Sequence, residues 1–159
     1  MNIKICCVGK LKDAFFLDAC AEFSKRLSRY CTLTIHEVAD EKAPETLHTS
    51  EERKVKDREG ERLLSVMDPK DHVIALTLGG KQYTSEAFSE HLSSLSVQGN
   101  PSIAFVIGGS LGLSDAVLRR ANEQLCLSRM TFPHRLARLI LLEQIYRAFR
   151  IERNEPYHK

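Results

Sequence analysis

Residues Ile103 to Gly112 constrain the fold most, because they join an apolar strand to an abrupt run of glycines. The run Ile-Ala-Phe-Val-Ile is followed at once by Gly-Gly-Ser-Leu-Gly, and Ser114 then offers a helix N-cap. Continuous apolar strands are typical of parallel sheets that helices cover on both faces. Ligands bind such sheets where the strands end, so the sequence predicts a ligand site at these glycines.

An earlier segment repeats this design. Residues 72–78 read His-Val-Ile-Ala-Leu-Thr-Leu, and Gly79-Gly80 follow them. Two neighbouring strands that end in glycines would outline one crevice. We expect this strand to end at the two glycines and to form a second wall of the pocket.

Strand-like and helix-like segments alternate along the chain, which predicts an α/β fold with a mostly parallel sheet flanked by helices. The hydrophobic periods place strands at 3–8, 33–38, 72–78, 103–107 and 124–128, and helices at 16–30, 49–66, 84–95, 114–121 and 135–153. Thr84 or Ser85 can cap the third helix, and Thr49-Ser-Glu-Glu52 matches a capping box for the second. Residues 40–49, which include Pro44, are expected to form a loop. The 159 residues fit one domain, 1–159.

The cysteines favour a reducing compartment. None of the five has Cys-x-x-Cys spacing, and all lie in apolar runs: Cys6, Cys7, Cys20, Cys31 and Cys126. This pattern predicts reduced core thiols in a cytoplasmic protein and no metal site. No apolar stretch approaches the length of a membrane span, so no membrane association is expected.

The charge of the chain is unevenly distributed. The formal net charge is only +2, yet residues 119–159 carry nine Lys or Arg against four Asp or Glu. A basic carboxyl-terminal quarter favours contact with an anion, and a phosphate backbone is the commonest candidate. A solvated helix surface would give the same pattern, so charge alone leaves both interpretations open.

The last helix, expected over 135–153, is apolar on more than one face. One face can cover the sheet, and the remaining apolar surface needs a second cover. A homodimer partner would supply it. Burial of the helix within its own domain is the alternative interpretation.

Residues 108–112 also match the Gly-x-Ser-x-Gly elbow of serine hydrolases, with Ser110 as the nucleophile. A triad would need Asp115 or Glu123 as the acid and His134 or His158 as the base. A five-residue pattern without fixed partners is a weak signal, and a serine hydrolase is therefore kept only as an alternative function.

Two further segments stand out. Leu127 to His134, read as Leu-Ser-Arg-Met-Thr-Phe-Pro-His, places polar and apolar side chains in one loop, which suits an adenine ring. The terminal Tyr157-His158-Lys159 offers stacking, proton transfer and a cation that binds phosphate. A plain polar loop and a frayed tail are the alternatives for these two segments.

Several motifs together resemble the methyltransferase H family of the large ribosomal subunit, of the SPOUT class. They are Gly9-Lys-Leu-Lys12, Asp40-Glu-Lys-Ala43, the strand ends at 76–80 and 107–112, the 127–134 segment, Glu143-Gln-Ile-Tyr-Arg-Ala148 and Tyr157-His158. The resemblance covers the whole chain. It implies a SPOUT-type sheet with a C-terminal trefoil knot, which would be a rare exception to the rule against threading. It also implies a homodimer.

The resemblance further implies S-adenosylmethionine as cofactor and N3 of a pseudouridine in large-subunit (23S) ribosomal RNA as substrate. We expect this RNA within the ribosome, and naked RNA and a free subunit stay open as alternatives. Carried over by position, the cofactor contacts fall on Leu76, Gly108, Leu127, Ser128, Arg129, Met130, Thr131 and Phe132. Ser110 then becomes an ordinary loop residue. Lys159 stands where relatives often have arginine, and this change keeps the charge but loses the planar fork of donors.

Within this picture we hypothesise a proton-transfer role for His158, with Tyr157 positioning the base. Arg147 and Lys159 would bind phosphate or the developing oxyanion, and Glu143 would orient Arg147 from one helical turn away. The C-terminal tail of one subunit would complete the cofactor pocket of the other subunit. An RNA-binding module without enzymatic activity is the third functional hypothesis.

Overall fold

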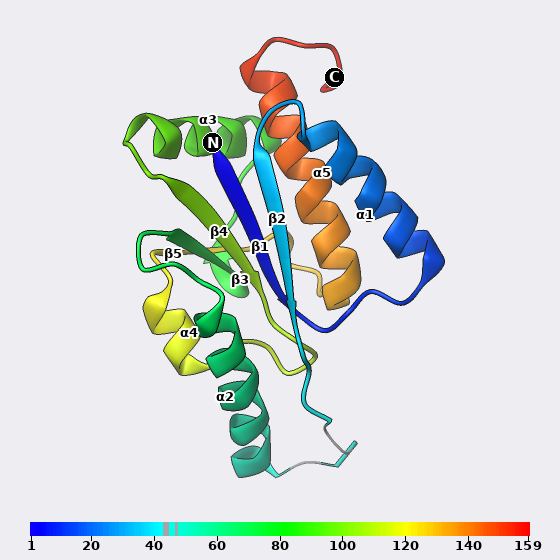
Figure 1. Cartoon of the computed structure of the whole chain (residues 1–159), viewed down its shortest axis with the longest axis vertical. Helices are drawn as coiled ribbons and strands as arrows, with labels where there is room; N and C mark the ends of the chain where they lie inside the picture. Colours follow the sequence, from blue (N-terminus) through cyan, green and yellow to red (C-terminus); the bar gives the residue numbers. More distant parts are fainter. Residues whose placement is uncertain (43–44, 47) are drawn as a thin grey trace.

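The computed structural model describes residues 1–42, 45–46 and 48–159. Ala43 of the Asp40–Ala43 motif and Pro44 of the expected loop lie outside this part of the chain. Strands and helices alternate from end to end (Figure 1): β1 Asn2–Val8, α1 Ala14–Leu27, β2 Thr32–Val38, α2 Thr49–Ser65, β3 His72–Lys81, α3 Ser85–Val97, β4 Ser102–Ile107, α4 Asp115–Arg120, β5 Glu123–Leu125 and α5 His134–Glu152.

The five strands form one sheet in the order β2-β1-β4-β3-β5, and every neighbouring pair is parallel. The expected α/β class with a parallel sheet is therefore confirmed. All strand carboxyl ends meet at one edge, and the glycines after β4 lie at the middle of that edge.

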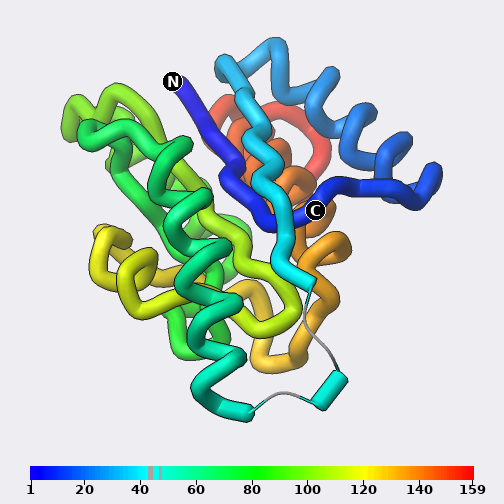
Figure 2. Tube along the Cα trace, turned by 60° about the horizontal axis from the view of Figure 1, so that its bottom comes forward, coloured from blue at the N-terminus to red at the C-terminus, as the bar shows by residue number. Residues whose placement is uncertain are grey.

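Alternation along the strands divides the core into two layers. Ile3, Ile5 and Cys7 of β1 belong to the larger cluster, which α1, α3 and α5 cover. Cys6 and Val8 belong to the smaller cluster on the opposite face, where α2 and α4 pack. Figure 2 shows α1 and α2 on opposite sides of β1 and β2.

Strand β3 differs from the expectation. It does not end at Gly79-Gly80 but continues to Lys81, and it pairs with Leu125 of β5 at both Leu76 and Lys81. A Cβ atom on Gly80 would lie 2.6 Å from the backbone carbonyl carbon of Leu125, closer than real Cβ atoms approach. The strand can curl around β5 because Gly80 has no side chain.

Strand β5 is shorter than expected and ends at Leu125, so residues 126–128 belong to the following loop. This loop leaves the edge of the sheet and leads into α5, which begins at His134, one residue earlier than predicted. The ladder with β3 ends early because the chain turns away from the sheet at this point.

Two predicted helix caps are confirmed. The Thr84 hydroxyl accepts from Ala87 N–H at 3.1 Å, and the Ser114 hydroxyl accepts from Val117 N–H at 3.3 Å. The capping box of α2 lies one residue earlier than predicted: His48 is the N-cap, and its N–H donates to the Glu51 carboxylate at 3.4 Å. The predicted cap is one residue too late, because His48, and not Thr49, has the extended backbone of an N-cap residue.

Helix α5 packs between α1 and α3, which cover two of its sides. Leu141, Leu142 and Ile145 are fully buried in this way within one subunit. Apolar residues on several faces of α5 therefore do not by themselves require a second subunit. Leu136, Leu139 and Ile140 remain half-buried.

The five cysteines are free, and all but the half-buried Cys31 are buried. No helix in the described part of the chain is both long and apolar enough to span a bilayer.

At the amino edge of the sheet, Lys4 and Asp71 form an ion pair of 2.9 Å. Asp71 is only 3% exposed, and its carboxylate also accepts from the Ser102 hydroxyl. Burial tends to raise the pKa of Asp71, but the hydrogen bonds from Ser102 and Lys4 outweigh burial and leave the pKa below its usual value. The pair ties β1 to the chain entering β3.

Candidate active site

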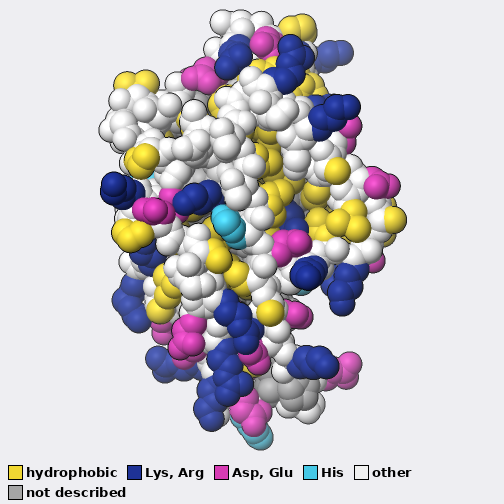
Figure 3. Space-filling view, in the orientation of Figure 1, with side chains coloured by type: hydrophobic (Ala, Val, Ile, Leu, Met, Phe, Trp, Pro, Cys, Tyr) yellow, Lys and Arg dark blue, Asp and Glu magenta, His cyan; other side chains and the backbone are white. Residues whose placement is uncertain are grey.

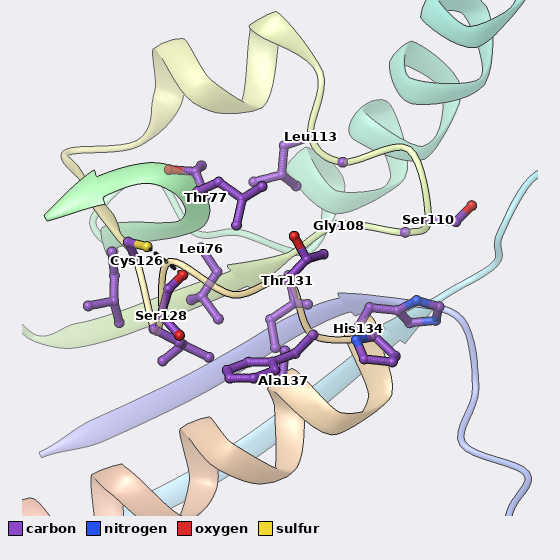
Figure 4. A pocket seen from close by; sticks show the side chains of 18 of the residues that line it. Leu76, Thr77, Gly108, Ser110, Leu113, Cys126, Ser128, Thr131, His134 and Ala137 are labelled. Carbon is purple, nitrogen blue, oxygen red and sulfur yellow. Dashed lines mark hydrogen bonds between the residues drawn. The ribbon is translucent and has the colours of Figure 1, made fainter. Parts of the chain in front are cut away.

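A cavity of about 850 Å³ lies at the carboxyl edge of the sheet. Three chain segments enclose it (Figure 4): the middle of β3, the end of β4 with its glycines, and the loop from β5 into α5. They contribute residues 76–78, 107–113 and 125–134, apart from Arg129. Apolar side chains and backbone make up most of the wall, which suits a flat heteroaromatic ring.

The glycine turn after β4 forms one part of this wall. A Cβ atom on Gly108 would lie 2.7 Å from the carbonyl carbon of Gly112, so any side chain at Gly108 would push the turn apart. Gly112 has φ +91°, a conformation that favours glycine. Behind the turn, the buried carboxylate of Glu59 packs against Gly109. The turn thus leaves its backbone facing the cavity.

The structure brings together seven of the eight residues proposed for the cofactor. The cavity is lined by Leu76, Gly108, Leu127, Ser128, Met130, Thr131 and Phe132. Arg129 was also expected to contact the cofactor, but this exposed residue does not line the cavity. Local hydrogen bonds shape the loop: Met130 N–H donates to the Ser128 hydroxyl at 3.0 Å, and the Cys126 thiol donates to the Ser128 carbonyl at 3.1 Å.

The sequence placed His134 at the end of the 127–134 segment and allowed it as a hydrolase base, but did not assign it to the cofactor site. The residue opens α5 and lines the cavity beside Pro133 and Ala137. Burial, with the nearby cations Arg135 and Arg138, lowers the pKa of His134, so its imidazole is neutral at neutral pH. Its position directly after the 127–133 loop was the signal that could have identified it.

Ser110 does not have the geometry of a hydrolase nucleophile. It is exposed at the outer end of the glycine turn, and its side chain points away from the cavity (Figure 4). Among the residues that the structure describes, no histidine hydrogen-bonds to its hydroxyl. The match to the elbow pattern is therefore not accompanied by a triad.

The proposed catalytic residues form a second cluster, on α5 and the tail. Arg147 donates to Glu143 Oε1 from Nε at 3.0 Å and from Nη2 at 2.6 Å. The Tyr157 hydroxyl donates to the same oxygen at 3.0 Å, and the Arg147 guanidinium lies 4.7 Å from the centre of the Tyr157 ring. Burial and the Glu143 carboxylate raise the pKa of Tyr157, which keeps the phenol protonated.

His158 completes this cluster, and Lys159 lies exposed at the carboxyl terminus. His158 Nδ1 lies 3.2 Å from Arg147 Nη1, and its Nε2 lies 2.7 Å from Glu86 Oε1. A guanidinium can only donate, so Nδ1 carries the lone pair and Nε2 carries the proton. This tautomer leaves Nδ1 as the atom of His158 that can accept a proton.

The cavity and the tail cluster are separate within one subunit. Ala137 is the last residue of α5 in the cavity wall, and the tail docks at Glu143, six residues further along the helix. At 1.5 Å per residue, this separation is about 9 Å. The termini lie at the same end of the molecule, at the opposite end from the strand carboxyl edge (Figure 1).

The surface carries charges of both signs. Figure 3 shows Lys and Arg side chains gathered over α2, and hydrophobic side chains in the hollow between β2 and α1. A second cavity of about 440 Å³ lies in this hollow, lined by Ser24, Ser28 and residues 31–33 and 35. It is remote from the glycine turn.

Comparison with known proteins assigns the family. A family model described as "Predicted SPOUT methyltransferase" matches residues 1–158. Proteins named ribosomal RNA large subunit methyltransferase H match over the full 159 residues and over their own full length. The one from Clostridium acetobutylicum is 56% identical, the one from Bacillus pumilus 56%, and the one from Listeria monocytogenes 54%.

A solved structure supports the fold. A Legionella pneumophila protein described as a methyltransferase, in complex with the cofactor SAM, superposes with a TM-score of 0.51 at 12% identity. The superposition covers 94% of this chain and 66% of that protein. Together with the full-length relatives and the family model, this likeness shows that the chain belongs to the ribosomal RNA large subunit methyltransferase H family of SPOUT methyltransferases.

Proposed function

We propose that this protein transfers a methyl group from S-adenosylmethionine to N3 of a pseudouridine in large-subunit ribosomal RNA. One observation carries the proposal: residues 76–78, 107–113 and most of 125–134 enclose a single apolar cavity. Relatives of the same length are named for this ribosomal RNA.

The cavity fits S-adenosylmethionine in its chemistry. Leu76, Leu127 and Phe132 supply apolar contacts for an adenine ring, and the backbone of Gly108 and of the 127–132 loop supplies donors and acceptors for its edges. When bound, the cofactor supplies an electrophilic methyl group. Arg129 lies outside the cavity wall, so we assign it no direct contact.

We also propose the C-terminal trefoil knot that the family resemblance implies. Three observations support it. Segments far apart in sequence enclose one cavity, and the backbone of β5 lies so close to Gly80 that no side chain would fit there. In addition, α5 packs on the face of the sheet opposite α2. A threaded chain would hold the 126–133 loop from both sides. The cofactor wall would then be rigid before any ligand binds.

A homodimer is part of the proposal. In one subunit the tail docks at Glu143, about 9 Å along α5 from Ala137 of the cavity wall, and none of its residues lines that cavity. An antiparallel partner would bring its Tyr157–Lys159 tail to this cavity. The half-buried apolar residues of α5, Leu136 and Ile140 among them, would form part of the contact.

The chemistry requires N3 to lose its proton. N3 lies between two carbonyl groups, and its deprotonation places negative charge on their oxygens. We assign Nδ1 of His158 as the proton acceptor, which requires Arg147 Nη1 to release this atom when the substrate binds. Arg147 and Lys159 would stabilise the oxyanion or hold phosphate, and Tyr157, as a neutral phenol, would position the base. Glu143 orients Arg147 through the paired hydrogen bonds.

We place the enzyme in the cytoplasm and its target RNA within the ribosome. Five free cysteines support a reducing compartment. A net charge of +2 gives a weak general attraction to RNA, which favours a substrate recognised by its shape as well as by its charge.

The test combines binding and chemistry. We expect S-adenosylhomocysteine to raise the melting temperature, and the enzyme to methylate ribosomes purified from a strain that lacks it, with the product mapped by mass spectrometry. A protein that is monomeric and indifferent to S-adenosylhomocysteine would overturn the proposal. Labelling of Ser110 by an active-serine probe would favour the hydrolase instead. Salt-sensitive RNA affinity without either response would favour a plain RNA-binding module.

A further inference from the structure

We propose that the connection between β1 and α1, residues 9–13, is a preordered binding surface for the phosphate backbone of the substrate RNA. The inference rests on the proposed function. It adds an interaction surface outside both the cofactor cavity and the C-terminal tail.

The connection begins at the rim of the cavity. Strand β1 lies between β2 and β4 in the sheet, so its end is next to the glycine turn. Val8 packs behind Gly109, and a Cβ atom on Gly9 would lie 3.9 Å from Nε2 of His134, which lines the cavity. A strand of RNA whose base enters the cavity would therefore pass close to this connection.

Hydrogen bonds fix the backbone of the connection. Gly9 N–H donates to the Val38 carbonyl at 2.8 Å, and the Gly9 carbonyl accepts from Arg138 Nη2 at 3.1 Å. Leu11 N–H donates to Glu37 Oε2 at 3.0 Å. Gly9 also has φ +88°, which any other residue would adopt only with strain. The connection is thus held in one conformation.

Two arginines of helix α5 hold this connection in place. Arg138 is only 3% exposed, and its Nη1 pairs with Glu37 Oε2 at 2.8 Å, while Arg135 pairs with Asp13 at 3.2 Å. Burial tends to raise the pKa of Glu37, but its hydrogen bonds from Arg138 and Leu11 N–H outweigh burial and lower it, so Glu37 stays ionised. A buried ion pair is often replaceable by apolar packing. Here its donors reach the backbone of the connection, which indicates a role in fixing conformation.

The connection presents two exposed cations, of which Lys10 also acts on the nearby Glu37 carboxylate and helps to lower its pKa. Lys10 and Lys12 are exposed, and neither forms an ion pair with a carboxylate in the described ranges. Figure 3 shows Lys and Arg side chains, with Asp or Glu side chains beside them, at the place where Figure 1 draws this connection. Two cations on a preordered backbone suit phosphate groups, because binding them costs little further ordering.

The experiment replaces both lysines, as Lys10→Gln/Lys12→Gln, and measures methyl transfer to ribosomes from a strain that lacks the enzyme. We expect KM for ribosomes to rise about tenfold near 0.1 M salt, with kcat and the S-adenosylhomocysteine Kd unchanged. The slope of log(kcat/KM) against log salt should become shallower by about 1.4, as for two lost contacts to single-stranded RNA.

The matched control is Lys54→Gln/Lys70→Gln, which removes two exposed lysines from α2 and from the connection after it. The control should keep the wild-type KM and salt slope. A KM for the Lys10/Lys12 variant within twofold of the control would overturn this inference and leave the proposed function standing. A wild-type enzyme that neither binds S-adenosylhomocysteine nor methylates ribosomes would overturn both.

Discussion

The Tyr157 hydroxyl donates a 3.0 Å hydrogen bond to Glu143 of its own subunit, so the C-terminal tail folds back onto the middle of α5. The same carboxylate holds Arg147, and Arg147 contacts His158. Glu143 thus holds Tyr157 and Arg147 directly and His158 through Arg147, while Lys159 lies exposed. These groups are assembled in each subunit, away from the subunit's own cofactor cavity.

The first prediction concerns this tail. We expect His158→Ala to lower kcat for methyl transfer at least about 100-fold, because it removes the proposed proton acceptor. The melting temperature and the affinity for S-adenosylhomocysteine should stay near wild type. Turnover assays and calorimetry check the two parts separately, and unimpaired turnover would remove His158 from the mechanism.

The second prediction tests the supply of the tail by a partner. A subunit that lacks residues 157–159 and a full-length subunit with Gly108→Val in the cofactor wall should each be inactive alone. When they are mixed and refolded together, we expect up to about a quarter of wild-type activity, since mixed dimers contain one complete site. No recovery in verified mixed dimers would contradict the shared site.

The third prediction concerns the close approach at Gly80. We expect Gly80→Ala to destabilise the protein by about 2–4 kcal/mol and to weaken S-adenosylhomocysteine binding, because the new methyl group would displace β5 and the loop that follows it. Gly79→Ala is the matched control, since a Cβ atom there meets nothing within 4 Å. Urea unfolding of both variants is the measurement, and equal stabilities would contradict the assigned contact.

The fourth prediction follows from Asp71, whose pKa in the folded protein lies below its usual value. Its stabilising effect is present above the unfolded pKa of about 3.9 and is lost as pH falls through the lower folded pKa. Asp71→Asn should cost about 2–3 kcal/mol at pH 7, because Lys4 loses its buried partner.

The same Asp71 variant should show a weaker loss of stability than wild type between about pH 5 and pH 2. Asp18→Asn on the exposed side of α1 serves as the control and should change stability by less than about 0.5 kcal/mol. Denaturant unfolding across this pH range checks both statements. Parallel pH curves for wild type and Asp71→Asn would rule out the assigned role of the carboxylate.

The fifth prediction concerns the thiols of β1. Burial raises the pKa of Cys6 to about 12 and the pKa of Cys7 to about 11. Both side chains should stay protonated and resist iodoacetamide at pH 8 in the native protein. Mass spectrometry after guanidinium unfolding, where all five cysteines should react, is the control. Rapid native alkylation of Cys6 or Cys7 would contradict the burial.

The secondary structure was largely predictable because its signals are local. The apolar run before Gly108 gave a buried strand, and the side chains of Thr84 and Ser114 cap the helices that they were expected to begin. The errors lie where a distant segment decides the outcome. Strand β3 passes through Gly79-Gly80 because β5, more than forty residues later, packs against Gly80.

The sequence predicted most of the residues that line the cavity, but it did not predict how they are arranged around it. The family motif gave residues 127–132 as cofactor contacts; it left out His134, which lines the cavity, and included Arg129, which does not. Whether a loop residue faces a cavity depends on the turn of the backbone, and Ser128 sets that turn through hydrogen bonds of its own.

By itself, the sequence determined the order of strands and helices, the two apolar layers and the glycine turn, since hydrophobic period and capping act over a few residues. Only the tertiary structure decided that β3, the glycine turn and the 125–134 loop enclose one cavity, and that the tail lies apart from it on α5. These relations depend on which distant segments can approach without collision. Packing sets that approach, and no local pattern encodes it.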